Sequence, residues 1–294
     1  MDRQHGPKRN HHILPRSYLK GFADVAKPSH VWVYRRGEDF NPGKHHLVHN
    51  PSLWAIKSAA VIRDYYALDD LEGRVEYEKY ENILEQHEAL GNRILPFVRS
   101  KAPLTLESKV WLSTYIEMMV RRVPNRTKYA DHLVESALLR FPRDLLARKA
   151  AEEGQFAQAL KFTRDWDATR SLLKRQLLLE GVVRRSKAIA EAIARMTWQF
   201  FLTSAPRFFI TTDNPAFFPR ELGLQRANSF LTFPISSRVS LFASHVQVPD
   251  CAYVRATTAQ VNLLNRVTLS GAGEWAFACL ARRSVINTWA KPIT

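Results

Sequence analysis

The chain has 294 residues, of which 46% are apolar, so it is long enough to bury a sizeable core as one large domain or as two. It carries 43 Lys and Arg against 28 Asp and Glu, a formal net charge of +15. This excess favours polyanionic partners such as nucleic acid, nucleotides or anionic lipid, and the alternative is a basic surface that serves only solubility. The two cysteines, Cys251 and Cys279, form no CxxC pair, so neither a zinc ribbon nor a redox motif is supported.

The sequence has no recognisable signal for export or membrane insertion. Residues 1–12 lack the apolar segment of a signal peptide, and no stretch approaches the roughly 18 apolar residues of a membrane-spanning helix. HExxH, GxxxxGK(S/T) and GxGxxG motifs are absent, so zincin, P-loop and Rossmann chemistry are unsupported. We expect a cytoplasmic protein without a membrane partner, and the sequence indicates no oligomeric state.

Residues 1–70 are expected to contain loops and short strands. Alternation of apolar and polar residues from His30 predicts a strand that ends near Gly37. Residues 45–50 are expected to form a second short strand. The apolar and aromatic stretch 59–68 is compatible with either a strand or a short helix.

Residues 71–200 are expected to be helical. Apolar residues recur at three- and four-residue spacing over 76–98, which predicts a helix that Pro96 ends or bends. Thr105 and Ser108 predict the start of a second helix, which Pro124 stops. Further helices are expected over roughly 129–150, 152–180 and 182–200.

Residues 201–294 are expected to be rich in strands. An apolar run at 207–215 ends in a turn signal, two neighbouring strands are expected at 229–236 and 238–245, and a helix over 256–271 precedes a last strand at 274–281. These sections predict an α+β fold in one compact unit. Its helical middle section packs on a mostly antiparallel sheet built from N- and C-terminal segments.

Short motifs occur in order along nearly the whole chain. An N-terminal motif leads into a Trp-x-Tyr strand, and its residues are His12, Ile13, Leu14, Pro15, Tyr18, Leu19, Phe22, Trp32 and Tyr34. An aromatic element and the end of a helix follow, with Asp64, Tyr65, Tyr66, Arg122, Val123, Pro124 and Arg126. The C-terminal motifs comprise Ile210, Thr211, Thr212, Asp213, Asn214, Pro215, Phe233, Pro234, Ile235, Ser236, Asn262 and Asn265.

Taken together, these motifs resemble the family of the domain of unknown function 4238. The resemblance implies which positions matter and supplies no chemistry for them. The chain departs from the family at Ile13, where an aromatic residue is usual, and this weakens a stacking role for that position. It also has Thr212 where Ser is common, and threonine keeps the hydroxyl group.

His12 and Asp213 are the candidate catalytic residues. An imidazole can act as a general acid or base near neutral pH, and Arg16 beside His12 would hold a phosphate. Asp213 lies where a buried apolar run emerges into a loop, a common place for functional residues. The alternatives are a structural hydrogen bond for His12 and a turn-forming role for Asp213.

The candidate substrate-binding residues are mostly donors and acceptors near these two positions. Arginines after the second helix would clamp a phosphate or pair with Glu117, and two asparagines three residues apart share one face of a later helix. The full set is Arg16, Tyr18, Arg122, Arg126, Thr212, Asn214, Asn262 and Asn265.

No metal site and no cofactor is assigned. His45, His46 and His49 form a histidine-rich tract that is better interpreted as an exposed loop than as a metal site, since a tetrahedral site needs further ligands. A divalent metal at Asp213 stays open as an alternative without a ligand motif.

Two functions remain open. The first is a nucleic-acid-directed phosphodiesterase of the RNase or DNase type, with a defence-system effector as its setting. In it His12 exchanges a proton and Asp213 orients it. The alternative is a non-catalytic nucleic-acid or partner-binding module, in which Trp32, Tyr34 and Trp54 stack on bases. A small anionic ligand is a third option. The first hypothesis requires His12 and Asp213 to share one cationic hollow.

Overall fold

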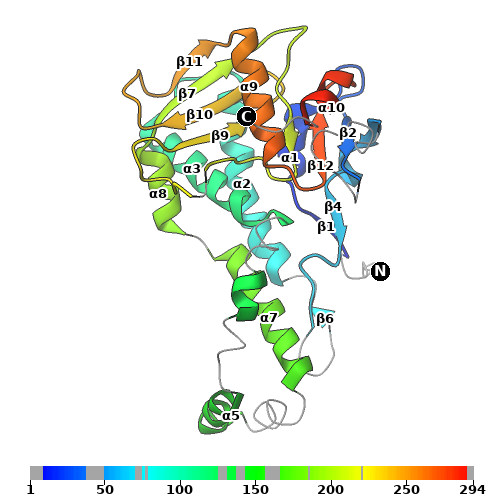
Figure 1. Cartoon of the computed structure of the whole chain (residues 1–294), viewed down its shortest axis with the longest axis vertical. Helices are drawn as coiled ribbons and strands as arrows, with labels where there is room; N and C mark the ends of the chain where they lie inside the picture. The colour runs from blue at the N-terminus through cyan, green and yellow to red at the C-terminus, as the bar shows by residue number, and fades with distance from the viewer. Residues whose placement is uncertain are drawn as a thin grey trace, which may run out of the picture. The chain divides into compact units, whose positions relative to one another are not determined.

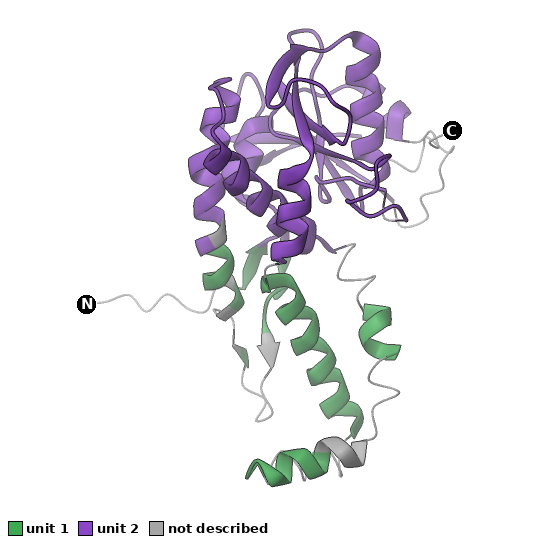
Figure 2. Ribbon diagram, turned by 90° about the vertical axis from the view of Figure 1, so that its left-hand side faces the viewer, with its two compact units in different colours: residues 1–11, 62–85, 125–184 green, residues 12–61, 86–124, 185–294 purple. Residues whose placement is uncertain are grey.

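The computed structural model describes residues 9–37, 50–69, 75–76, 79–124, 131–136, 143–155, 166–184, 186–219 and 221–289. The chain forms two compact units, each drawn from three stretches of sequence (Figure 2). Unit 1 comprises residues 1–11, 62–85 and 125–184, and unit 2 comprises residues 12–61, 86–124 and 185–294. The sections 1–70, 71–200 and 201–294 predicted from the sequence differ from these units, because they divide the chain by its secondary structure. They stay a prediction.

The first four-stranded sheet of unit 2 comes entirely from the C-terminal part of the chain. Its order is β11 (Ala252–Arg255), β7 (Thr197–Leu202), β10 (Val239–Ser244) and β9 (Phe230–Pro234). The β7–β10 and β10–β9 pairs are antiparallel, whereas β11 runs parallel to β7. The predicted strands at 229–236 and 238–245 are therefore confirmed. The helix expected to reach residue 200 is wrong at its end, because β7 begins at Thr197.

The second four-stranded sheet joins the two ends of the chain, as predicted. Its order is β3 (Ser52–Ala55), β2 (His30–Arg35), β12 (Trp275–Ala278) and β8 (Thr211–Thr212), and its pairs are antiparallel. Val33 of β2 lies opposite Phe277 of β12, and both side chains are buried. The strands expected from His30 and at 274–281 are confirmed, and the one expected at 45–50 lies outside the described residues. Two two-stranded sheets pair β1 (Asn10–His12) with β4 (Val61–Arg63) and β5 (Leu68–Asp69) with β6 (Val75–Glu76).

Two helices of unit 2 begin at capping residues that the sequence contains. α3 (Leu106–Arg121) starts after Thr105, whose side chain accepts a hydrogen bond from the Ser108 amide, as predicted. α9 (Thr258–Ser270) starts with a capping box between Thr257 and Gln260. The other helices are α1 (Arg16–Leu19), η1 (Lys20–Phe22), η3 (Ile56–Ser58), α2 (Lys79–Arg99), α5 (Arg143–Glu152), α7 (Trp166–Val183), α8 (Lys187–Arg195) and α10 (Arg283–Trp289).

Two buried clusters place α9 against both sheets of unit 2. Val261 and Leu264 pack with Phe209 of the loop before β8 and with Phe201 and Phe242 of the first sheet. At its other end, Leu269 belongs to a cluster with Ile210, with residues of β2 and β12 in the second sheet, and with residues of α10. Figure 1 shows α9 beside β9 and α10 beside β12. α9 therefore packs against both sheets. The fold is α+β.

Of the helices from the middle of the chain, α3 packs on the first sheet and α2 packs on α3. Tyr115 of α3 packs edge-on against Phe233 of β9, and Gly91 of α2 leaves room for the Tyr115 ring, because a Cβ there would approach a ring carbon to 2.2 Å. α2 continues to Arg99, one turn beyond Pro96, so this proline lies inside the last turn of the helix. No helix within the described ranges is long and apolar enough to cross a bilayer.

Candidate functional site

The Asp213 carboxylate holds the turn between α9 and β12. It accepts hydrogen bonds from the backbone amides of Gly273 at 2.7 Å, Glu274 at 2.6 Å and Trp275 at 3.2 Å. The side chain is only 3% exposed. Burial raises the pKa of Asp213, and the three amides and the nearby Arg36 oppose this effect. The residue therefore has a structural role, but at a turn about 60 residues away and not in its own turn as the sequence suggested, and its catalytic role stays a prediction.

The neighbouring site residues hold the same region together. The Thr212 hydroxyl donates to the Asn214 carbonyl, and the Asn214 carboxamide donates to the Gly271 carbonyl at 2.9 Å. Asn265 of α9 accepts from the Ile210 amide at 3.1 Å and donates to the Phe208 carbonyl at 2.9 Å. The structure thus brings Thr212, Asp213, Asn214 and Asn265 together in a hydrogen-bonded joint between β8, α9 and β12.

His12 lies in a separate group with two arginines. Its Nε2 atom accepts a hydrogen bond from Arg16 Nε at 3.0 Å, so the neutral ring carries its proton on Nδ1. Arg122, which is 2% exposed, donates to the His12 carbonyl and to Glu88 Oε1 at 2.7 Å. Among the described residues, no hydrogen bond or ion pair joins His12 to Asp213. Both belong to unit 2, and their sharing one hollow stays a prediction.

Tyr18 joins three of the sequence motifs at one buried hydroxyl. Its Oη atom lies 2.7 Å from the Thr211 hydroxyl and donates to the Pro234 carbonyl at 2.7 Å. Since its only proton goes to Pro234, Thr211 is the donor in the other bond. Burial raises the pKa of Tyr18 well above its ordinary value. Tyr18 is fully buried, and its contacts are those of a structural residue.

Arg99 supports the same junction from α2. Its guanidinium donates to the carbonyls of Ser17 at 3.1 Å, Tyr18 at 3.0 Å and Ile235 at 3.2 Å. Gly21 makes room for this contact, because a Cβ there would lie 2.5 Å from Arg99 Nη2. The N-terminal motif and the Phe-Pro strand are therefore fastened together by one arginine that the sequence analysis did not single out.

The arginines at the end of α3 are paired. Arg121 bonds Glu117, which also accepts from the Ser186 amide at 2.8 Å. This confirms pairing with Glu117 as the role of Arg121. Arg126 and the tract His45, His46 and His49 lie outside the described residues. Within the described part of the chain, no three His, Cys, Asp or Glu side chains are grouped to hold a metal ion.

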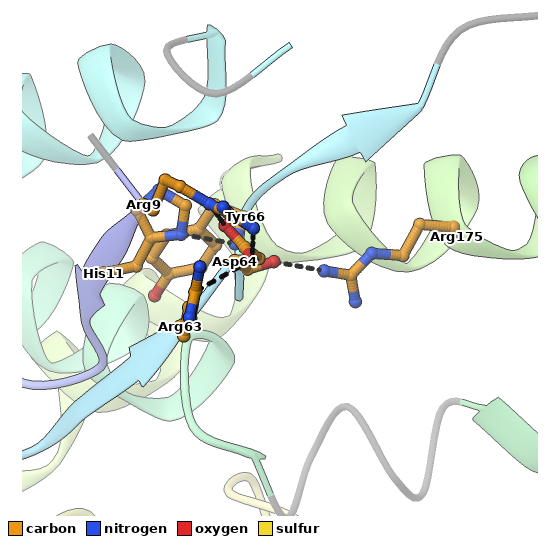
Figure 3. Close-up of polar contacts among 6 residues, drawn as sticks. All are labelled: Arg9, His11, Arg63, Asp64, Tyr66 and Arg175. Atoms are coloured by element: carbon orange, nitrogen blue, oxygen red, sulfur yellow. Dashed lines mark hydrogen bonds and ion pairs between the residues drawn. The ribbon is translucent and has the colours of Figure 1, made fainter. Parts of the chain in front are cut away.

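An exposed ion cluster surrounds Asp64 in unit 1 (Figure 3). Arg9 binds its two carboxylate oxygens at 3.0 and 2.7 Å, and Arg63 lies 3.6 Å away. The hydrogen bond from Arg9 is the main cause that lowers the pKa of Asp64. Because the carboxylate already occupies the two arginines, this cluster is poorly suited to holding a phosphate.

The same element is also fixed through its backbone. Arg175 of α7 donates to the carbonyls of Asp64, Tyr65 and Ala67, and His11 Nδ1 accepts from the Tyr66 amide at 2.9 Å. Asp64 has a positive φ of 56°, a conformation that aspartate tolerates better than most residues. These contacts make the Asp-Tyr-Tyr element a structural feature of unit 1.

An arginine-lined cleft between α9 and α10 is the remaining candidate. It consists of two adjoining hollows of about 420 and 130 Å³ that share Asn262, Ser284 and Thr288. Arg266 lines the wider hollow, and Arg207 and Arg282 line the narrower one. The described residues that line the two hollows include no Asp or Glu. The cleft is therefore a concentration of positive charge that no carboxylate among its described lining residues neutralises.

Only two asparagines of this cleft were predicted from the sequence as site residues. Asn262 and Asn265 were predicted, and Asn262 is exposed in the cleft. Arg207, Arg266 and Arg282 were missed, because the first lies in a loop, the last precedes the short helix α10, and only the fold brings them together. The spacing of four residues between Asn262 and Arg266 was the available signal, since it places both on one helix face.

The comparisons with known proteins give a family and no function. No curated protein and no solved structure matches the chain. The model of one family, described as protein of unknown function (DUF4238), matches residues 10–281. The match includes the His12, Asp64, Asp213 and Asn262 motifs and covers most of the sequence. The chain therefore belongs to the DUF4238 family.

Proposed function

We propose that the protein binds nucleic acid without cleaving it, through Arg207, Arg266 and Arg282 of the cleft between α9 and α10. The observation that carries the proposal is the gathering of three arginines with no carboxylate among the described lining residues. Guanidinium groups bind phosphate oxygens in a bidentate manner, and a protein of charge +15 attracts polyanions at long range.

The state of each arginine supports this role. Arg266 makes no hydrogen bond or ion pair within the described part of the chain. Arg282 lies over the Phe208 ring, 5.5 Å from its centroid, a position that leaves its donors available. Arg207 bonds the Thr258 hydroxyl through Nη1 only. Half-buried Arg99 and buried Arg122, by contrast, bond protein carbonyls or a carboxylate.

Binding is better supported than phosphodiester hydrolysis. The His12 ring accepts a hydrogen bond from Arg16, and all three amide contacts of the Asp213 carboxylate serve the turn. Hydrolysis and a defence-system role stay predictions. The two cysteines are free, which is compatible with the reducing cytoplasm where we place this function.

The test is the salt dependence of binding to a fluorescently labelled single strand, measured by anisotropy. Three phosphate contacts contribute about 2 to the slope of log affinity against log salt concentration, at about 0.7 per contact. Replacement of Arg207, Arg266 and Arg282 by glutamine should lower the slope by that amount. The control replaces Lys187 and Arg195, exposed residues of α8 that lie near Glu191, and should change it little.

An unchanged slope in the triple variant would refute the proposal. The same samples, run on a denaturing gel, test hydrolysis. Cleavage by the wild-type protein that disappears in His12→Ala would replace binding by the phosphodiesterase hypothesis.

A further inference from the structure

The wider hollow is formed by one face of α9 and one face of α10. Ala259, Asn262, Leu263 and Arg266 follow the helical spacing of three and four residues, and from α10 come Ser284, Asn287 and Thr288. A volume of about 420 Å³ lies in the range of small-molecule sites. The two faces therefore border an open hollow with room for a single nucleoside.

The side chains that line this hollow combine one apolar surface with paired donors and acceptors. Leu263 is 55% exposed, so its side chain offers an apolar surface to the hollow. Asn262 and Asn287 lie on opposite helices, and each carboxamide offers donors and an acceptor. The Thr288 hydroxyl donates to the Ser284 carbonyl at 2.7 Å, which leaves its oxygen as an acceptor.

The narrower hollow differs in its charge. Arg207 and Arg282 line it together with the apolar side chains of Phe208 and Val285. It opens beside the wider hollow, because Asn262, Ser284 and Thr288 belong to both. A group of high negative charge would be bound here, a short distance from whatever occupies the wider hollow.

We infer that the cleft binds one unpaired nucleotide of a strand, with its base against Leu263 and the two asparagines of the wider hollow and its phosphate in the narrower one. Arg266, at the wider hollow, binds the phosphate of the adjoining nucleotide. The inference rests on the proposed function and specifies its substrate class as single-stranded nucleic acid. A base has an apolar face, which Leu263 contacts, and a polar edge, which Asn262 and Asn287 bind. A paired base exposes neither its face nor its pairing edge, so a duplex cannot occupy the hollow.

The test compares a labelled single strand with a blunt duplex of the same length. Asn262→Ala combined with Asn287→Ala should weaken binding of the single strand about tenfold and leave the duplex affinity unchanged, since tenfold corresponds to the loss of about one good base contact. Both residues are exposed, so the double variant should fold. Asn228→Ala, an exposed asparagine outside the cleft, is the matched control and should bind both ligands like the wild type.

A competition experiment identifies what occupies the cleft. Adenosine monophosphate should displace the single strand from the wild-type protein at concentrations at which inorganic phosphate does not, and the double asparagine variant should lose this difference. Equal competition by the two compounds, or equal affinity of the double variant and wild type for the single strand, would overturn the inference. In that case the proposed function stands if the triple arginine variant still shows the lower slope of log affinity against log salt concentration. It falls together with the inference if the slope is unchanged.

Discussion

The joint around Asp213 and the cleft between α9 and α10 differ in whether their polar side chains form hydrogen bonds within the protein. At the joint, the side chains of Asp213, Asn214 and Asn265 bond backbone groups of the protein itself. In the cleft, Arg266 and Asn262 face outward and bond no described partner. Polar residues of a sequence motif can thus be fully used by the fold, whereas unused donors gathered in a hollow indicate a ligand.

The largest expected effect comes from Asp213, if it belongs to the fold. Asp213→Asn replaces one acceptor oxygen by an NH₂ group that faces backbone amides, so at least one buried amide loses its partner. The free energy of unfolding should fall by about 3 kcal/mol, the upper range for hydrogen bonds to a charged group. Chemical denaturation measures this loss, with exposed Glu221→Gln as the control of equal charge change. A stability equal to that of the wild type would return Asp213 to the candidate catalytic residues.

Substitution of Tyr18 tests whether the N-terminal motif also stabilises the fold through buried hydrogen bonds. Tyr18→Phe leaves the Pro234 carbonyl and the Thr211 hydroxyl buried without their partner, which should lower the free energy of unfolding by about 2 kcal/mol. Tyr253→Phe removes a single hydrogen bond to the Ala102 carbonyl and should cost about 1 kcal/mol. Thermal denaturation of the two variants compares them directly. Equal losses would contradict the role of Tyr18 as the junction of three motifs.

The fold was more accessible from the sequence than the site. Period-two alternation identified β2, and the Thr105 cap identified the start of α3, because both are local signals. Residues 197–200 of β7 were predicted as the end of a helix, because short apolar runs fit either structure. α10 has only seven residues and was missed. The motif positions were recognised, but their contacts depend on residues about 60 positions away in the sequence, as for Asp213 and Gly273.

Asn265 and Asn262 both lie on α9, so they allow a structural asparagine to be compared with a ligand-binding one on the same helix. Asn265→Ala removes both hydrogen bonds to the 208–210 segment and should lower the free energy of unfolding by about 1 kcal/mol. Asn262→Ala removes an exposed side chain and should change it by less than about 0.5 kcal/mol. Denaturation and single-strand binding, measured on both variants, separate the two roles. A stability loss in Asn262→Ala without a loss of binding would assign both asparagines to the fold.

The smallest effect concerns the exposed Asp64 cluster of unit 1. Arg9 holds the pKa of Asp64 below its ordinary value, so the ion pair stabilises the folded chain above the ordinary aspartate pKa and is lost as the pH falls through the lowered one. Arg9→Gln should raise the pKa of Asp64 toward its ordinary value, as measured by NMR titration of the carboxyl carbon. Arg63→Gln is the matched control and should raise it less, because Arg63 lies 3.6 Å away and donates no hydrogen bond to the carboxylate. Equal shifts in the two variants would mean that proximity of charge, and not the two bonds from Arg9, sets this pKa.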